Sequence, residues 1–243
     1  MTPTITLGGQ SLNERFTITN LRRPFPEARN ELVDVSGRAG SVLAWRTLGT
    51  RTVSFRLWAT SHDHETLMDT YSWLATLLHS ARELTLVISD EGGRVRRVVP
   101  EGLLDYDEYV ELGSMELTLL QPDPYCTLPP YSVSVPSGGS ASFTLEHANP
   151  NITITAAQAK RDASTQLWGL RYDGGDYVRV KLATSSGTPV TIDCSSARHV
   201  TVGGEVAMVT PDSDWPRLAA GAHTVVMDKG TGAATLTITE RLL

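Results

Sequence analysis

Several features that would point to a particular class of protein are scarce in this sequence. Its 243 residues include two cysteines, Cys126 and Cys194, and aromatic residues make up 7% of the chain. Two cysteines cannot build the disulfide framework of a small secreted domain, and a chain of this length can bury a core without one. The two thiols could pair in principle, but we expect both to be reduced.

Long apolar runs and an excess of basic charge are missing as well. No window approaches the roughly 18 apolar residues of a membrane helix, and the first residues, MTPTITLGGQ, lack the basic and apolar regions of a secretory signal. We therefore expect synthesis in the cytosol and no membrane insertion. The net charge of −6 gives no overall attraction to nucleic acid, and 40% hydrophobic with 20% charged residues is typical of a globular protein.

Motifs for catalysis are also missing. The chain contains no P-loop, no G-x-G-x-x-G and no G-x-S-x-G, so Ser195-Ser196 with nearby His199 lacks the setting of a catalytic triad. His62 and His64 could ligate a metal, but at a helix start their rings point apart and a polar helix entry explains them. The acidic stretch Asp105 to Glu111 lacks the glycine of a calcium loop and is typical of a solvated strand face. We expect no enzyme, no cofactor and no metal.

What the sequence does contain is β structure. Paired glycines separate runs rich in Val, Thr, Ile and Leu, and glycine pairs suit two-residue hairpin turns. Three stretches are predicted to be hairpins: LTLVISDEGGRVRRVVP, RYDGGDYVRV and HVTVGGEVAMV.

One segment has helical periodicity instead. Between residues 63 and 82, Leu67, Tyr71, Leu74 and Leu78 recur at steps of three and four. This spacing predicts one amphipathic helix packed on a sheet, with Ser61 as a candidate N-cap.

A proline-rich stretch, QPDPYCTLPPYSVSVP, indicates a domain boundary near Pro124, because proline cannot continue a central strand. The predicted domains are 1–124 and 125–243. The first is α+β, a sheet or sandwich with one helix and a β-hairpin arm, and the second is an all-β sandwich of about eight short strands.

The stretch SGRAGSVLAWRTLGTR has no nucleophile, base or ligand set, but it interleaves arginine, tryptophan and glycine. Arginine and tryptophan are enriched at protein interfaces, and a glycine-hinged arm at about 37–52 could add a strand to a neighbour's sheet. The alternative is a solvated strand face with core tryptophans. The candidate interface residues are Gly37, Arg38, Gly40, Trp45, Arg46 and Arg51.

Two short pieces of the second half are similar to parts of the galectin sugar site. They are HANPN, with His147 and Asn149, and WGLR, with Trp168. Asn151 stands where the sugar site has arginine, and the expected glutamate is missing from the second piece. These residues are either a sugar contact or strand-edge packing.

The order of these elements resembles the distal tail protein family of siphophages. Gly-Arg-x-Gly at residues 37–40, the PDPY exit at residues 122–125 and the closing pattern at residues 214–227 carry the resemblance. It implies six copies in a ring formed by the first domains, with an arm belting adjacent subunits and galectin-like second domains. Such a ring joins the tail tube protein to a tail-tip protein, tail-associated lysin or baseplate protein, and phage DNA passes through its lumen without specific binding.

The resemblance places the protein at the tail tip of the virion, with a structural role and no catalysis. Two alternatives stay open. One is a carbohydrate-binding adhesin whose second domain recognises a host cell-surface glycan, and the other is a hydrolase acting on the cell wall.

Overall fold

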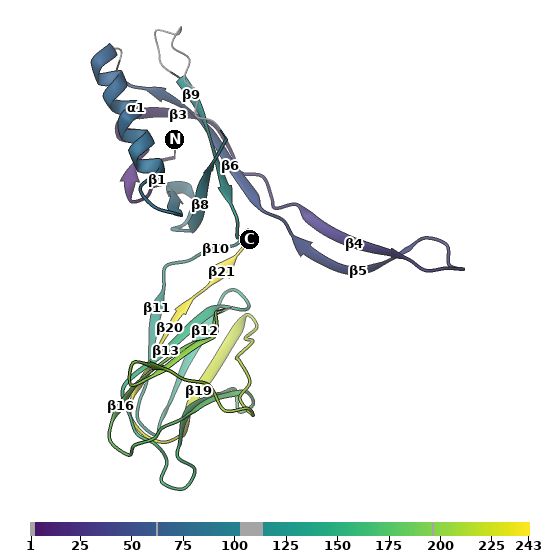
Figure 1. Cartoon of the computed structure of the whole chain (residues 1–243), viewed down its shortest axis with the longest axis vertical. Helices are drawn as coiled ribbons and strands as arrows, with labels where there is room; N and C mark the ends of the chain where they lie inside the picture. Colours follow the sequence, from purple (N-terminus) through teal and green to yellow (C-terminus); the bar gives the residue numbers. More distant parts are fainter. Residues whose placement is uncertain (1–2, 62, 103–113, 196) are drawn as a thin grey trace. The chain divides into compact units, whose positions relative to one another are not determined.

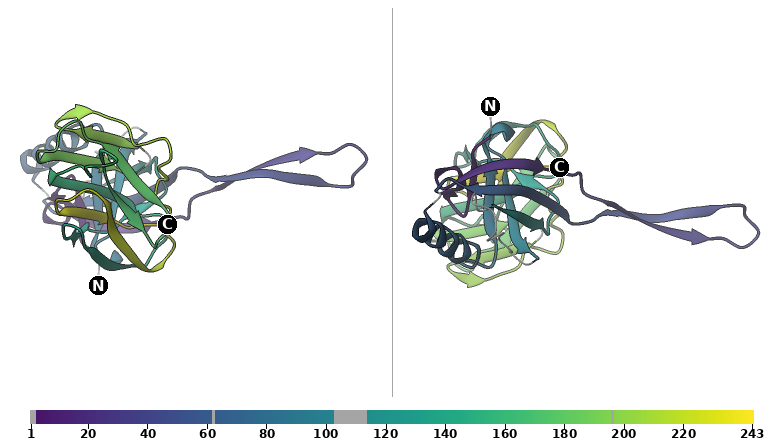
Figure 2. Two further views of the ribbon diagram at one scale, coloured as in Figure 1. Left: turned by 90° about the horizontal axis from the view of Figure 1, so that it is seen from below. Right: turned by 90° about the horizontal axis from the view of Figure 1, so that it is seen from above.

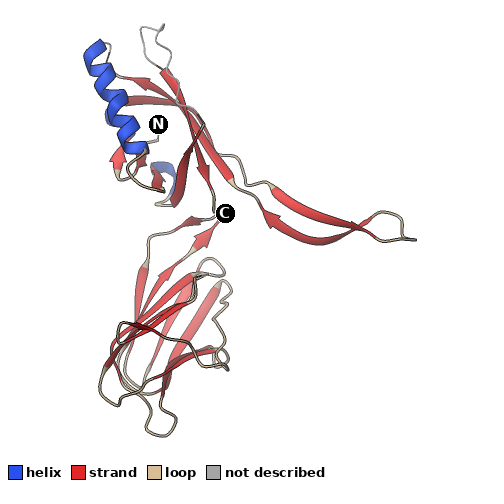
Figure 3. Ribbon diagram, viewed as in Figure 1, coloured by secondary structure: helices blue, strands red, loops and turns tan. Residues whose placement is uncertain are grey.

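The computed structural model describes residues 3–61, 63–102, 114–195 and 197–243. The chain divides into two compact units, Met1–Cys126 with Leu243 and Thr127–Leu242. Strands dominate both units, and the α-helix seen among the described residues belongs to the first (Figures 1 and 3). The predicted combination of a sheet domain with one helix and a β-sandwich is confirmed.

The first unit is built on a sheet with the strand order β2-β1-β7-β8-β9-β6-β3. Val53, Phe55 and Leu57 on one strand are buried at every second position, so one face of that strand lies on the core. The strands are β1 (Ile5–Leu7), β2 (Gln10–Ser11), β3 (Phe16–Arg22), β6 (Arg51–Ala59), β7 (Leu84–Ile88), β8 (Val95–Glu101) and β9 (Ser114–Gln121), with 3-10 helices at Leu12–Glu14 and Ser89–Glu91.

Helix α1 (His64–Leu78) packs on the core of this sheet through Tyr71, Leu74 and Leu78. It is shorter than the predicted 63–82. Its N-cap is Asp63, whose carboxylate accepts the backbone N–H of Thr66 at 3.1 Å, so the expected cap at Ser61 is wrong. The helix ends where the Ser80 side chain donates to the carbonyl of Leu77 at 2.7 Å.

Strands β4 (Ala28–Asp34) and β5 (Ser41–Leu48) pair with each other in a separate two-stranded sheet. They continue the β3–β6 hairpin beyond an interruption at Pro24 and Pro26, which lack the N–H that a ladder needs. The backbone N–H of Gly49 donates to the carbonyl of Glu27 at 2.7 Å and closes the base. We call residues Ala28–Leu48 the arm; it projects from the first unit in every view (Figures 1 and 2).

The second unit is a sandwich of two antiparallel sheets around one apolar core that includes Trp168, Leu170 and Tyr172. The sheet orders are β11-β20-β13-β16-β17-β18 and β12-β19-β14-β15. The strands are β11 (Tyr131–Val135), β12 (Ser140–Leu145), β13 (Asn151–Ala159), β14 (Leu167–Tyr172), β15 (Tyr177–Lys181), β16 (Thr188–Asp193), β17 (His199–Val202), β18 (Glu205–Val206), β19 (Gly221–Lys229) and β20 (Ala234–Thr239). The two-residue strands β10 (Cys126–Thr127) and β21 (Arg241–Leu242) pair with each other and belong to neither sandwich sheet.

The three predicted hairpins are confirmed as antiparallel pairs. They are β7 with β8, β14 with β15 and β17 with β18. Their turns contain glycines with positive φ, such as Gly174 at +73° and Gly203 at +65°, which is the backbone conformation that paired glycines tolerate.

Candidate interaction site

The arm exposes large apolar side chains that contribute nothing to a core of its own unit. Leu32 is 62% exposed and Trp45 is 57% exposed, and at the arm's base Phe25 is 88% exposed. An isolated two-stranded hairpin is at best marginally stable in water, and exposed apolar side chains at this density mark an interaction site. The arm therefore has the properties of a segment that becomes buried against another protein surface.

Both faces of the arm carry such side chains. Leu32 lies opposite Leu43, and Val33 lies opposite Val42. Neighbouring residues of a strand point to opposite faces, so the leucine pair lies on one face and the valine pair on the other. A partner that covers one face leaves the other face exposed, so full burial of the arm requires contacts on both sides.

The structure corrects the predicted bounds of the arm. Gly37 and Gly40, with φ of +82° and +79°, lie in the turn at the arm's tip together with Arg38, so they cannot be its hinge. The interruption of the ladder lies at Pro24 and Pro26 instead. Trp45 and Arg46 are exposed on β5.

The predicted range of 37–52 placed Arg51 in the arm, but Arg51 lies outside it. It is the first residue of β6 and is buried. The last two residues of the predicted range, Arg51 and Thr52, therefore belong to β6 of the sheet and not to the arm.

A cluster of charged side chains lies at the base of the arm. Arg23 donates to Asp90 at 2.8 and 2.9 Å and to Glu91 at 2.8 Å, and Arg96 donates to Glu91 at 2.9 Å. Burial alone would raise the pKa of Glu91, but the hydrogen bonds from Arg96 and Arg23 hold it below its usual value. The paired carboxylates tie the 3-10 helix at Ser89–Glu91 to the end of β3, where the chain leaves for the arm.

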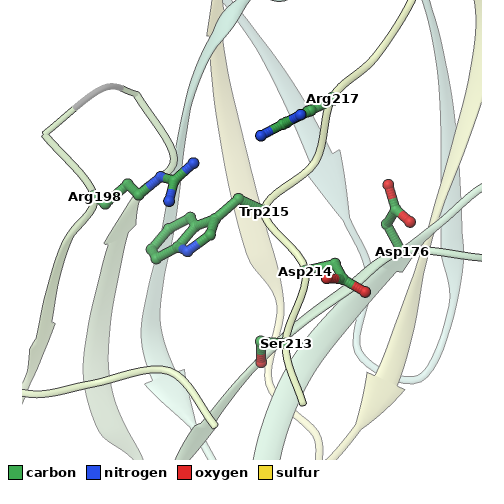
Figure 4. Close-up of a pocket in the computed structure, with 6 residues that line it drawn as sticks. All are labelled: Asp176, Arg198, Ser213, Asp214, Trp215 and Arg217. Atoms are coloured by element: carbon green, nitrogen blue, oxygen red, sulfur yellow. The ribbon is translucent and has the colours of Figure 1, made fainter. Parts of the chain in front are cut away.

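The second unit contains a polar cavity of about 440 Å³ (Figure 4). The guanidinium of Arg198 lies over the ring of Trp215, 5.6 Å from its centroid, and Trp215 is packed against the sandwich core. The lining residues are Asp176, Arg198, Ser213, Asp214, Trp215 and Arg217. Hydrogen-bond donors and acceptors around one aromatic ring suit a polar ligand with an apolar face.

Comparison with known proteins gives this arrangement a family. The model for the phage tail protein RIFT-related domain matches residues 7–121, and the model for the C-terminal domain of the siphovirus-type tail component matches residues 145–242. The chain belongs to the siphovirus Dit family of tail components. The two matches fall on the sheet domain and on the sandwich, so both parts of the chain carry the family's fold.

Solved structures share that fold over the whole chain. The Dit protein of phage SPP1, described as a paradigm of hub adsorption apparatus in phages infecting Gram-positive bacteria, matches with a TM-score of 0.75 and 19% identity, covering 100% of both chains. A chain of the phage P2 baseplate in its activated conformation with calcium matches with a TM-score of 0.58 and 10% identity, covering 100% of this chain and 99% of that chain. A search of curated sequences found no match.

The sugar contact was one of two interpretations of the galectin-like pieces, and it is wrong at Trp168. Its side chain is 0% exposed and lies in the sandwich core, so no sugar can reach its ring. The backbone N–H of His147 donates to Glu240 at 2.7 Å, and the Asn149 N–H donates to the carbonyl of Leu218 at 2.8 Å. Through their backbone N–H groups, His147 and Asn149 therefore join this turn to distant segments of the sandwich.

The structure also bears on the residues considered as metal ligands or nucleophiles. Among the described residues, no three His, Cys, Asp or Glu side chains gather as a metal site; His62 and the stretch 105–111 lie outside the described residues. Both cysteines are free, and burial raises the pKa of Cys194 to about 12, so its thiol is a poor nucleophile at neutral pH. No helix in the described part of the chain is long and apolar enough to cross a membrane.

Proposed function

We propose that this chain is a hub subunit of a siphophage tail tip, in which six copies form a ring through the first units. The ring joins the tail tube to the tail-tip or baseplate proteins, and DNA passes through its lumen. Family membership supports a structural role in the tail, and the similar SPP1 Dit protein is itself described as a hub. The partners of this chain are accordingly other tail proteins and copies of itself, in the virion.

The exposed apolar arm is the observation that carries the proposal. Its side chains lie on a hairpin with two faces, and a hairpin of this kind gains stability when another chain buries it. In a ring each subunit gives an arm to a neighbour and receives one, so every arm is covered. An interface of this type should bury more than about 1,200 Å² in total.

The acidic charge is compatible with a conduit for DNA. The chain has a net charge of −6. Basic surfaces bind phosphate tightly by releasing counterions, which would hold the genome in place. A ring with little positive charge on its lumen lets DNA pass.

Removal of the arm tests the proposal. Because the Gly49 N–H already bonds to the Glu27 carbonyl, Ala28–Leu48 can be replaced by Asn-Gly as a two-residue hairpin turn. We expect a folded monomer with the thermal unfolding midpoint of the parent's first unit and no rings in electron micrographs. Rings of unchanged size and stability without the arm would refute its role.

A second candidate function is binding of a host glycan through the sandwich. The observation that favours it is the polar cavity around Trp215, with arginine and aspartate side chains at its rim (Figure 4). Guanidinium and carboxylate groups bind sugar hydroxyls as donors and acceptors, and an indole ring packs against the apolar face of a sugar. This site differs from the buried Trp168.

A further inference from the structure

Arg51 occupies an unusual position at the arm's base. It is the first residue of β6, two positions after Gly49, and its side chain shares the inner face of the strand with Val53 and Phe55. The residue is 7% exposed. Gln121 of β9 lies directly opposite in the ladder and is 0% exposed. Two polar side chains therefore close one end of the apolar core.

Neither of these side chains is fully paired in the described part of the chain. Among the described residues, the Nε of Arg51 is fully buried and has no hydrogen-bond partner. Gln121 Nε2 donates to the carbonyls of Asp123 at 2.7 Å and Tyr125 at 3.0 Å, while its Oε1 is buried and meets no donor from the described residues. Almost all buried polar groups in proteins are paired, so the unpaired Nε of the Arg51 guanidinium requires an explanation.

The neighbouring charges compensate Arg51 only in part. Burial lowers its pKa most and the positive charge of Arg96 lowers it further, and the opposing effects of Cys126 and Glu91 do not restore it. Glu91 is occupied by Arg96 and Arg23, and Asp90 by Arg23. Three arginines thus share two carboxylates at the base of the arm, which leaves one positive charge unmatched.

We propose that Arg51 binds a carboxylate from the arm of a second copy of this chain. This inference rests on the ring of the proposed function and names a contact within it. A protein surface that covers the arm also reaches its base, two residues from Arg51. The arm and its base expose three carboxylates, on Glu27, Glu31 and Asp34, that a neighbouring copy would present. The charge is unfavourable in the free subunit and is compensated on assembly.

The consequence is a pair of opposite effects from one substitution. Replacing a buried unpaired charge by an apolar side chain of similar length stabilises a folded chain, whereas removing one partner of a buried ion pair weakens the complex. Arg51→Met should therefore raise the thermal unfolding midpoint of the full-length monomer and weaken self-association at least tenfold. Arg56→Met is the matched control, because Arg56 lies on the same strand but is exposed, and it should change neither quantity.

Sedimentation and thermal melts of wild type and both variants test this. A melting point that falls in Arg51→Met with unchanged association would show that Arg51 supports its own subunit, for example by pairing with Gln121, and would overturn the inference. Stabilisation of the wild type alone by added chloride would assign the site to a free anion and overturn it as well. A wild type that never self-associates would contradict the ring and this contact together, whereas equal rings in wild type and variant contradict the contact alone.

Double-mutant cycles identify the carboxylate. Arg51→Met is combined in turn with Glu27→Gln, Glu31→Gln and Asp34→Asn, and self-association is measured for each set. The true partner gives a combined loss close to that of Arg51→Met alone, while other positions add independently. Independent addition for all three would overturn the assignment to the arm.

Discussion

Trp45→Ala tests whether an exposed side chain of the arm stabilises its own subunit or the contact between subunits. Trp45 lies on β5, and its indole N–H donates to the carboxylate of Glu31 on the opposite strand. In the free chain 57% of the residue is exposed and no core depends on it. Its removal should change the free energy of unfolding of the monomer by less than about 0.5 kcal/mol, as for other surface substitutions.

The effect on assembly should be much larger. A fully buried tryptophan covers up to about 250 Å², so the 57% that is exposed here corresponds to about 140 Å² available to a partner. At about 25 cal/mol per Å², complete burial stabilises the contact by about 3.5 kcal/mol, and incomplete burial by about 2 kcal/mol. Association should therefore weaken about 30- to 300-fold.

The assay is the concentration dependence of mass in solution, measured for wild type and variant beside their thermal melts. Met208→Ala serves as control, because Met208 is 86% exposed but belongs to the second unit and not to the arm. We expect the control to assemble like the wild type. Unchanged association of Trp45→Ala, or a monomer that unfolds without the indole, would refute the reasoning.

Two further predictions concern the second unit. Nδ1 of His223 lies 2.7 Å from Asp173 and Nε2 lies 2.8 Å from the Ala219 carbonyl; burial alone would lower the pKa of His223, but these hydrogen bonds raise it above 6.5. The free energy of unfolding that the charged ring adds is fully present below pH 6.5 and is lost as the pH rises through the raised pKa of His223. His223→Gln should therefore lower the free energy of unfolding, measured in urea, by about 1 kcal/mol at pH 6 and by less at pH 9. An equal loss at both pH values would contradict this. For the glycan candidate, wild type should bind cell-wall polysaccharide saturably and Trp215→Ala should lose at least tenfold in affinity. Phe25→Ala should bind normally, and an array without saturable binding would exclude the candidate.

The sequence predicts the local elements well where one residue type decides them. Glycine pairs determine the turns of three hairpins, and leucines at helical spacing determine α1. An arm is also predicted, at about 37–52, from the interleaved arginine, tryptophan and glycine. Its bounds were misassigned because Gly37 and Gly40 suit a tip as well as a hinge, whereas the interruption of the ladder is marked by Pro24 and Pro26.

Burial is what the sequence leaves undecided. Trp168 lies between Leu167 and Gly169, Trp45 between Ala44 and Arg46, and Trp215 between Asp214 and Pro216. The first is in the core, the second is exposed and the third lines a cavity. Arg51 likewise resembles the exposed arginines of the arm, and a buried position follows only from its register opposite Gln121. Partners in a ladder are set by tertiary structure, so no local pattern reveals them.

The mass of the purified protein in solution, followed by negative-stain images of the same peak, tests the central claim most directly. One chain has a mass of 26.4 kDa, so six copies have about 158 kDa, six times that value. The account predicts this mass and a ring with a central hole, at protein concentrations at which the arms associate. A 26.4 kDa monomer at every concentration, also in the presence of the tail tube and tail-tip proteins, would contradict it.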